Sequence, residues 1–182
     1  MAASSTTLPV LPLKNTVVYP QIIVPLAIGR AMSLAAVNSA LDHGRELVTV
    51  AQRDPDEQQP ERDGLYDVGT VVTISRIEKR DQGAQIIVQG LRRVRLGECR
   101  WDGEQLLAEV SPLPDVTMAS LGDDETAAEA LVRENQQLAQ AIAHLFDQDN
   151  GAQIYQQLVG SLPDPITQMY RIASLANLDL ER

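Results

Sequence analysis

The sequence predicts an α+β chain in two parts. The first part is a mostly antiparallel, barrel-like β domain with one short helix, and the second is a C-terminal helical bundle. Prolines interrupt apolar runs near the start, β segments with tight turns follow, and helical spacing replaces alternation in the last third. We place a frayed tail at residues 1–7, the β domain at 8–115, a linker at 116–122 and the bundle at 123–182.

The opening stretch Leu8–Arg30 organises the predicted β domain. Its aliphatic and β-branched residues are interrupted by four prolines, which are Pro9, Pro12, Pro20 and Pro25. Proline donates no backbone hydrogen bond, so it marks strand edges, strand starts and bulges. The stretch therefore predicts three short strands, LPVLPL, TVVY and IIVPLAI, that bend a sheet. Leu34, Val37 and Leu41 then recur at helical spacing, which predicts the short helix at Ala31–His43.

A meander completes the predicted sheet. Apolar and β-branched residues predict strands at Glu46–Gln52 and Tyr66–Ile77, separated by the charged loop Arg53–Gly64. This loop has two interpretations, a solvated surface loop or an acidic contact arm. Turn residues at Lys79–Ala84 and Trp101–Glu104 predict two tight turns among the strands QIIVQG, LRRVRLGECRW and QLLAEVSPL.

The last third has the pattern of a small helical bundle. A long helix between Asp123 and Asp147 carries one apolar face, formed by Ala127, Leu131, Leu138, Ile142 and Leu145. The segments AQIYQQLVG and LPDPITQMYRIASLANL predict two shorter helices after an Asn-Gly turn. Acidic residues outnumber basic ones ten to three from Asp123 onward. The chain stops at Arg182 without the character of a tail, which favours a piece of a longer chain.

Composition narrows the classes of function and location. The net charge of −10 disfavours nucleic acids and anionic membranes as partners, because binding to phosphates needs a basic face. No apolar run approaches the length of a membrane span, and the first residues lack the pattern of a secretory signal. The single cysteine, Cys99, allows no internal disulfide, so we expect a reducing, cytoplasmic setting.

The sequence lacks the patterns of catalytic chemistry. It contains neither a GxxxxGK[ST] phosphate loop nor a GxSxG nucleophile elbow. Two histidines, His43 and His144, are too few for a metal site, and two lysines, Lys14 and Lys79, leave few options for a Ser–Lys dyad. We therefore predict a non-enzymatic chain that binds no metal and needs no cofactor.

Four segments carry a family resemblance through their order and spacing. They are LPLKNTVVYPQIIVPLAIGRAMSL, VAQRDP, LYDVGTVVTI and VQGLRRVRL, and they cover most of residues 8–110. Together they resemble the N-terminal domain of Lon, the ATP-dependent protease of bacteria and organelles. The resemblance implies a domain that selects damaged or tagged proteins and helps a hexamer to assemble. Complete Lon carries Walker motifs and a Ser–Lys protease domain, so ATP and magnesium would belong to the presumed parent protease.

The segment Tyr19–Pro25 is the predicted substrate-binding surface. A receptor for unfolded proteins needs exposed apolar residues and tolerance of sequence. Consecutive Ile22, Ile23 and Val24 cannot all face inward in a strand of period two. The predicted contact residues are Tyr19, Pro20, Ile22, Ile23, Val24, Pro25, Arg30 and Met32. Two alternatives stay open, namely that the fold covers both faces of the segment and that Met32 fills the core.

The basic cluster Arg92, Arg93 and Arg95 has three interpretations. In the first interpretation the cluster binds nucleic acid. In the second it contacts acidic substrates or a neighbouring subunit. In the third the arginines lie on the outer face of the sheet and pair with Glu98 or Glu109. Nucleic-acid binding is disfavoured, because it needs aromatic platforms or a wider basic face.

The leading hypothesis is a non-catalytic substrate-recognition and hexamer-assembly domain of a Lon-like protease that serves protein quality control. Its partners would be exposed apolar segments of unfolded or damaged proteins and other Lon subunits. The alternative is a stand-alone interaction module that binds a defined partner or a small ligand in a barrel pocket.

Overall fold

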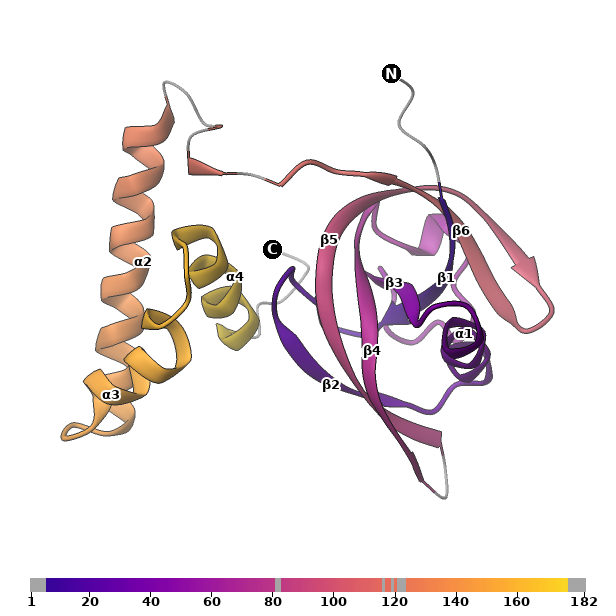
Figure 1. Cartoon of the computed structure of the whole chain (residues 1–182), viewed down its shortest axis with the longest axis horizontal. Coiled ribbons are helices and arrows are strands. Elements are labelled where there is room, and N and C mark those ends of the chain that lie inside the picture. The colour runs from indigo at the N-terminus through magenta and orange to yellow at the C-terminus, as the bar shows by residue number, and fades with distance from the viewer. Residues whose placement is uncertain (1–5, 81–82, 116, 119, 121–123, 177–182) are drawn as a thin grey trace. The chain divides into compact units, whose positions relative to one another are not determined.

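A computed structural model of the chain describes residues 6–80, 83–115, 117–118, 120 and 124–176 (Figure 1). The chain divides into two compact units after Pro114. The described strands and one helix belong to the first unit, and the remaining α-helices belong to the second, which confirms the α+β class. Residues 1–5 of the predicted tail and residues 116, 119, 121 and 122 of the predicted linker lie outside the described residues. Thr6 and Thr7, predicted as tail, already belong to the first strand.

The first unit contains one sheet. Its described strands are β1 (Thr6–Leu13), β2 (Ile23–Ile28), β3 (Glu46–Ala51), β4 (Val68–Arg80), β5 (Gly83–Asp102) and β6 (Gln105–Pro112). The hydrogen-bonded order is β2-β5-β4-β3-β1-β6. The last strand of this order, β6, also pairs with the second strand, β5. Only β1 and β3 pair in parallel among the described strands, because the chain between them crosses over through β2 and a helix.

Two strand predictions differ from the structure. Residues 14–22 form no strand, although TVVY was predicted as one. Val18 is buried there, and its carbonyl oxygen accepts a hydrogen bond from the Thr70 hydroxyl group at 2.6 Å. Val18 thus packs in the core of the unit, although the segment that contains it forms no strand. The segments QIIVQG and LRRVRLGECRW, predicted as separate strands, are parts of the 20-residue strand β5.

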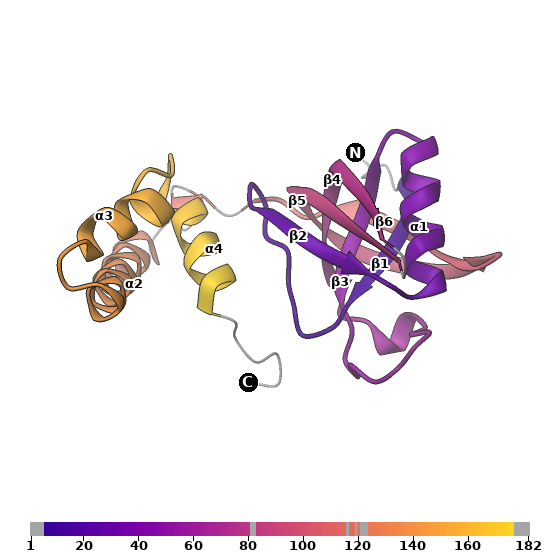
Figure 2. The same ribbon diagram turned by 90° about the horizontal axis from the view of Figure 1, so that it is seen from below.

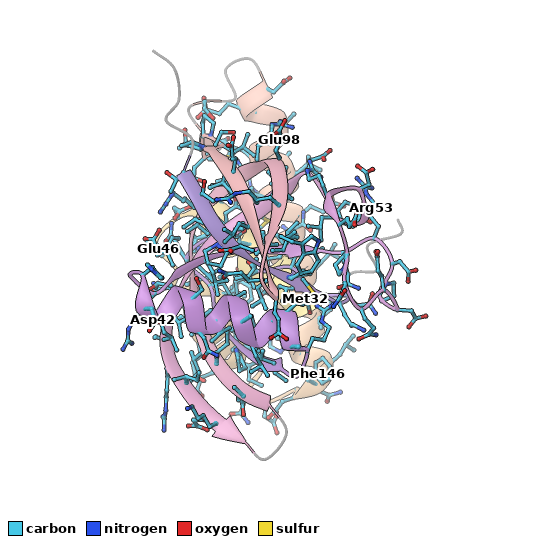
Figure 3. The ribbon with its side chains drawn as sticks, turned by 90° about the vertical axis from the view of Figure 1, so that its right-hand side faces the viewer. Met32, Asp42, Glu46, Arg53, Glu98 and Phe146 are labelled. Carbon is cyan, nitrogen blue, oxygen red and sulfur yellow. The ribbon has the colours of Figure 1, made fainter. Side chains whose placement is uncertain are left out.

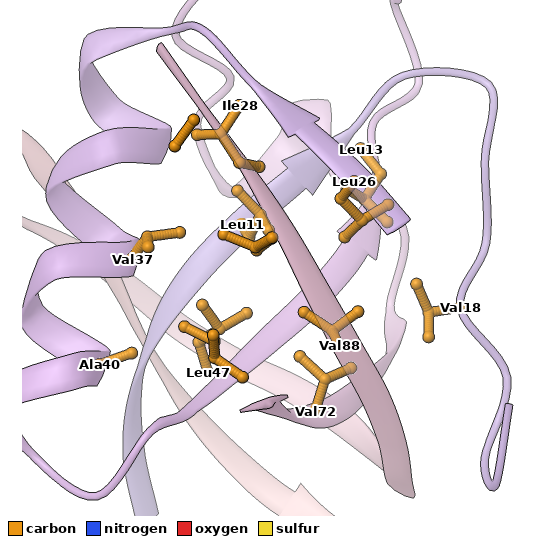
Figure 4. Close-up of a cluster of buried hydrophobic side chains, with 13 residues drawn as sticks. Leu11, Leu13, Val18, Leu26, Ile28, Val37, Ala40, Leu47, Val72 and Val88 are labelled. Atoms are coloured by element: carbon orange, nitrogen blue, oxygen red, sulfur yellow. The ribbon is translucent and has the colours of Figure 1, made fainter. Parts of the chain in front are cut away.

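Aliphatic side chains fill the first unit. Helix α1 (Ala31–Asp42) lies along one side of the sheet, as Figure 2 shows. Beneath it, Val37 and Ala40 join Leu11 and Leu47 in a buried cluster that draws on five of the strands (Figure 4). This core is built without aromatic rings, which agrees with the low aromatic content of 3% in the sequence.

The second unit has a small core. Its helical segments are α2 (Glu125–Phe146), α3 (Gly151–Tyr155), a π-helical turn at Gln156–Gly160 and α4 (Pro165–Ala176). A Cβ atom at Gly151 would lie 2.6 Å from the Cα of His144, so glycine allows α3 to approach α2 closely. Ala143, Tyr155 and Val159 form the buried cluster of this unit. Such a small cluster leaves most of the apolar face of α2 without cover from the described residues.

Candidate functional site

The segment Tyr19–Pro25 forms a turn and the start of β2. The Gly90 N–H of β5 donates a hydrogen bond to the Ile22 carbonyl oxygen at 3.0 Å, which fastens the turn to the sheet. Ile22 is buried, whereas Ile23 exposes 57% of its surface. Val24 is half-buried and packs against the cluster beneath α1. Of the three consecutive apolar residues, Ile23 is therefore the one that faces solvent.

The other predicted contact residues contribute little further apolar surface. Pro20 is buried, Tyr19 is half-buried and Pro25 is exposed on β2. Met32, in the first turn of α1 (Figure 3), exposes 2% of its surface and belongs to a further buried cluster of the unit, which also contains Val48 and Leu65. A substrate contact through Met32 needs a surface position that its side chain does not have. The candidate surface of the first unit is therefore reduced to Ile23 and Pro25.

Arg30 has a structural role at the entry to α1. Its Nη1 donates to the Gln52 Oε1 at 2.9 Å, and its Nη2 donates to the Pro12 carbonyl oxygen at 2.5 Å. Nη1 also lies 3.4 Å from the Glu57 carbonyl oxygen. These bonds hold the loop after β3, on which Figure 3 labels Arg53, close to the start of α1. Partial burial lowers the pKa of Arg30 from its ordinary value.

A larger apolar surface lies on α2. Leu131, Leu138, Ile142 and Leu145 share the face that the sequence predicts, and each is more than half exposed, from 53% for Ile142 to 82% for Leu145. Phe146, the last residue of the helix, exposes 85%. The described residues therefore leave this face as a surface rather than as the interior of a bundle. Exposed apolar side chains gathered on one helix are typical of interaction sites, so this face is a candidate binding surface.

Part of this face borders a groove of about 470 Å³ between α2, α3 and α4. From α2, its wall contains Asn135, Leu138, Ala139, Ile142, Ala143 and Phe146. From the other helical segments, it contains Ile154, Tyr155, Leu158, Val159, Ile172 and Leu175. Asn135 is the one residue of this wall with a fully polar side chain, and Tyr155 is the one with a ring hydroxyl group. The groove can therefore accept apolar side chains, with few groups to read a particular sequence.

The sequence prediction missed this groove, because periodicity shows that a helix face is apolar but not what covers it. The predicted helix lengths did not indicate it either, because the segments AQIYQQLVG and LPDPITQMYRIASLANL are longer than the helices α3 and α4 that form within them. The long helix has 22 residues, about 33 Å at 1.5 Å per residue, whereas α3 has five and α4 has twelve. Two short helices cannot cover the whole length of such a face.

Comparison with known proteins identifies the family. The family described as the ATP-dependent protease La (LON) substrate-binding domain matches residues 7–182. The chain belongs to this family. The match confirms the resemblance to the Lon N-terminal domain found in residues 8–110, and it extends that resemblance over the helical unit.

Curated relatives of this chain include Lon proteases. The Lon protease of Nitrosococcus oceani is 34% identical over 179 residues, covering 96% of this chain and 22% of the relative. That of Escherichia coli K12 is 35% identical over 127 residues, covering 69% of this chain and 16% of the relative. The chain therefore spans about a fifth of the length of these relatives.

Two solved structures share the fold of this Lon substrate-binding domain. The N-terminal domain of Mycobacterium avium complex Lon protease matches with a TM-score of 0.67 at 20% identity, covering 94% of this chain and 82% of that chain. A Lon N-terminal domain protein from Xanthomonas campestris matches with a TM-score of 0.50 at 18% identity, covering 93% and 98%. At these identities the likeness concerns the fold alone.

As a Lon substrate-binding domain, the chain represents a non-catalytic part of the family's proteins. Within the described ranges, no three His, Cys, Asp or Glu side chains gather in a group that could hold a metal ion. Cys99 is half-buried, and this burial raises the pKa of its thiol, which disfavours the reactive thiolate. No helix of the described part is long and apolar enough to cross a membrane.

The basic cluster on β5 makes contacts within the first unit. Arg92 forms an ion pair with Glu46 of β3 at 3.2 Å, and Arg93 donates to the Pro114 carbonyl oxygen at 2.8 Å. Pairing on the sheet is thus present, but Arg92 has Glu46 as its partner in place of the predicted Glu98 or Glu109.

Asp147 organises the turn between α2 and α3, next to the groove residue Phe146. Its carboxylate accepts hydrogen bonds from the Asn150 side chain at 2.9 Å and from the backbone N–H groups of Asn150 at 3.0 Å and Asp149 at 3.1 Å. The bonds from Asn150 lower the pKa of Asp147. Because the folded-state pKa is depressed, this stabilisation is present above the unfolded-state pKa and is lost as the pH falls through the folded-state pKa.

We therefore expect acid to loosen this turn, and Asp147→Asn to remove that response. The measurement is the amide chemical shift of Asp149 and Asn150 during a titration from neutral pH into acid. Asp149→Asn, in the same exposed turn, is the matched control and should keep the response of Asn150. Identical titration curves for the original chain and Asp147→Asn would contradict the role of the carboxylate.

Proposed function

We propose that the chain is the substrate-recognition and hexamer-assembly part of a Lon-like ATP-dependent protease, and that it binds exposed apolar segments of unfolded or damaged proteins. The apolar groove between α2, α3 and α4 is the observation that carries this proposal. Other Lon subunits are the second partner, and the cytoplasm is the location. ATP and magnesium act in other parts of the parent, and this part needs neither. We also interpret the strand order, in which β6 pairs with β5 as well as with β1, as barrel-like and the second unit as an open helical bundle.

The chemistry of the groove suits segments that are buried in native proteins. Removing apolar surface from water stabilises a complex by roughly 25 cal/mol per Å², whatever the order of the side chains. The groove has few polar groups that would reject one apolar sequence in favour of another. Single contacts of this kind are weak, and a hexamer would supply avidity by presenting several grooves at once.

The charge of the second unit adds a preference. Residues 124–176 carry seven acidic side chains and two basic ones, Arg133 and Arg171. An excess of one sign around an apolar surface attracts partners of the opposite sign and raises their association rate. The favoured occupant is therefore an apolar segment flanked by lysine or arginine.

An NMR titration of the isotopically labelled chain tests the proposed function. One target protein is added in its native form and in a destabilised form. We expect shifts at Leu138, Ile142 and Phe146 with the destabilised form alone. Shifts confined to Ile23 and Pro25 would overturn the assignment to the groove, and no shifts with either form would overturn substrate recognition by this chain.

The charge preference gives a separate prediction. A peptide with an apolar centre flanked by lysines should bind about five- to tenfold more tightly at low salt than the same centre flanked by glutamates. The difference should shrink as salt is added, and a glutamine-flanked peptide should lie between the two. Fluorescence anisotropy of labelled peptides measures the affinities. Equal affinities would remove the charge preference and leave apolar recognition in place.

A further inference from the structure

A pocket of about 360 Å³ lies in the first unit, between the start of α1 and strands β1 and β2. Its apolar wall includes Leu13, Leu26 and Ile28. Its polar side is formed by Lys14, Thr16, Arg30 and Ser33. The pocket is independent of the groove on the helical unit, and the function proposed above does not use it.

Ser33, in the first turn of α1, and Arg30, at its N-cap, bring the start of the helix to the polar side of the pocket. The first helical hydrogen bond joins the Leu34 N–H to the Arg30 carbonyl oxygen at 3.0 Å, so the N–H groups of residues 31–33 precede it. Arg30 occupies the N-cap position without a side-chain cap hydrogen bond. Uncapped N–H groups and the helix dipole together favour a negative charge at this position.

Ser33 points to a ligand independently of the helix end. Its residue surface is 97% buried, since 3% is exposed, and it lines the pocket. Its hydroxyl group has no hydrogen-bond partner within the described part of the chain. Buried polar groups in folded proteins are almost always hydrogen-bonded, so a bound oxygen atom would complete this site.

The cations at the pocket lack a compensating carboxylate. Arg30 bonds to an amide oxygen and to carbonyl oxygens, and none of the ion pairs among the described residues includes it. Lys14 is exposed and lines the same pocket. An anion in this pocket would have Lys14, Arg30 and the first-turn residue Ser33 among its lining residues.

We propose that this pocket binds a small oxyanion, a carboxylate or a phosphate, through the Ser33 hydroxyl and N–H groups, with Lys14 and Arg30 supplying positive charge. The apolar wall formed by Leu13, Leu26 and Ile28 would hold a non-polar group attached to a carboxylate. Inorganic phosphate would use the polar side alone.

NMR titration of the intact labelled chain tests the site at constant ionic strength. The probes are inorganic phosphate, N-acetyl-leucine, and neutral N-acetyl-leucinamide as the uncharged control. We expect saturable shifts of the Ser33 and Leu34 amides with one or both anions, and none with the amide. Saturation by phosphate alone identifies a phosphate site, and saturation by N-acetyl-leucine alone identifies a carboxylate site. No saturable shift with either anion, or equal shifts with the neutral amide, would overturn the proposal.

Three variants test whether the anion binds at this pocket. Ser33→Ala should lower the affinity about three- to tenfold through loss of one hydrogen bond, and alanine preserves the helix. Lys14→Gln should also weaken binding, whereas Lys79→Gln, which changes the only other lysine of the sequence, should leave it unchanged. Equal losses in the two lysine variants would show general attraction to a positive charge and overturn a site at this pocket.

Discussion

The variant Ile142→Asp is expected to weaken the binding of apolar segments to the second unit by about tenfold to hundredfold while the chain stays folded. Ile142 lines the groove and is 53% exposed, so aspartate costs little in the free protein. In the complex, the variant loses the burial of one large aliphatic side chain, worth about 1.5–3 kcal/mol, and places a charge in an apolar wall. The dissociation constant for a destabilised protein should therefore rise by about tenfold to hundredfold.

The control for this prediction is Leu145→Asp. Leu145 lies on the same helix and is 82% exposed, but it is not part of the groove wall. The two variants carry the same charge, so a difference between them reports the groove itself. Isothermal titration with a destabilised protein measures both affinities, and circular dichroism checks that α2 is intact. Equal losses in the two variants would indicate a diffuse apolar surface, and full binding by Ile142→Asp would exclude the groove.

The first unit could be predicted to a large extent, because its signals are local. Prolines, alternating apolar residues and turn residues predicted most strands, and helical spacing predicted α1 within one residue of its end. The exception was TVVY, where strand propensity is strong but Val18 packs into the core as part of a connection. Strand pairing is a long-range property, so propensity alone could not separate these two outcomes.

The candidate site shows the same division between local and long-range information. The period of two correctly required one of Ile22, Ile23 and Val24 to face outward, and Ile23 does. Whether Met32 is core or surface depends on packing against distant strands, which one sequence does not reveal. For α2, periodicity located the apolar face, and only the structure showed that the short helices α3 and α4 leave it open.

The variant Gly90→Ala is expected to destabilise the first unit strongly. A Cβ atom at this position would collide with the Tyr19 carbonyl oxygen and lie 2.8 Å from the Tyr19 carbonyl carbon and 3.1 Å from the Pro20 Cα. The obstacle is backbone, so a side-chain rotation cannot relieve it. The turn would have to move, and this would break the two hydrogen bonds that join Gly90 to Gln21 and Ile22. We expect the free energy of unfolding to fall by about 2–4 kcal/mol, from overpacking and lost hydrogen bonds.

Gly29→Ala is the matched control for this substitution, because a Cβ atom there meets nothing within 4 Å and the backbone is not in the left-handed region. Urea unfolding followed by the fluorescence of Trp101, the single tryptophan of the chain, reports the first unit. Gly29→Ala should change the unfolding free energy by less than about 0.5 kcal/mol. Equal midpoints for the two variants would contradict the close approach of the Tyr19 turn to β5. A large loss in Gly90→Ala alone would support the close approach of the Tyr19 turn to β5, which the absence of a side chain at Gly90 allows.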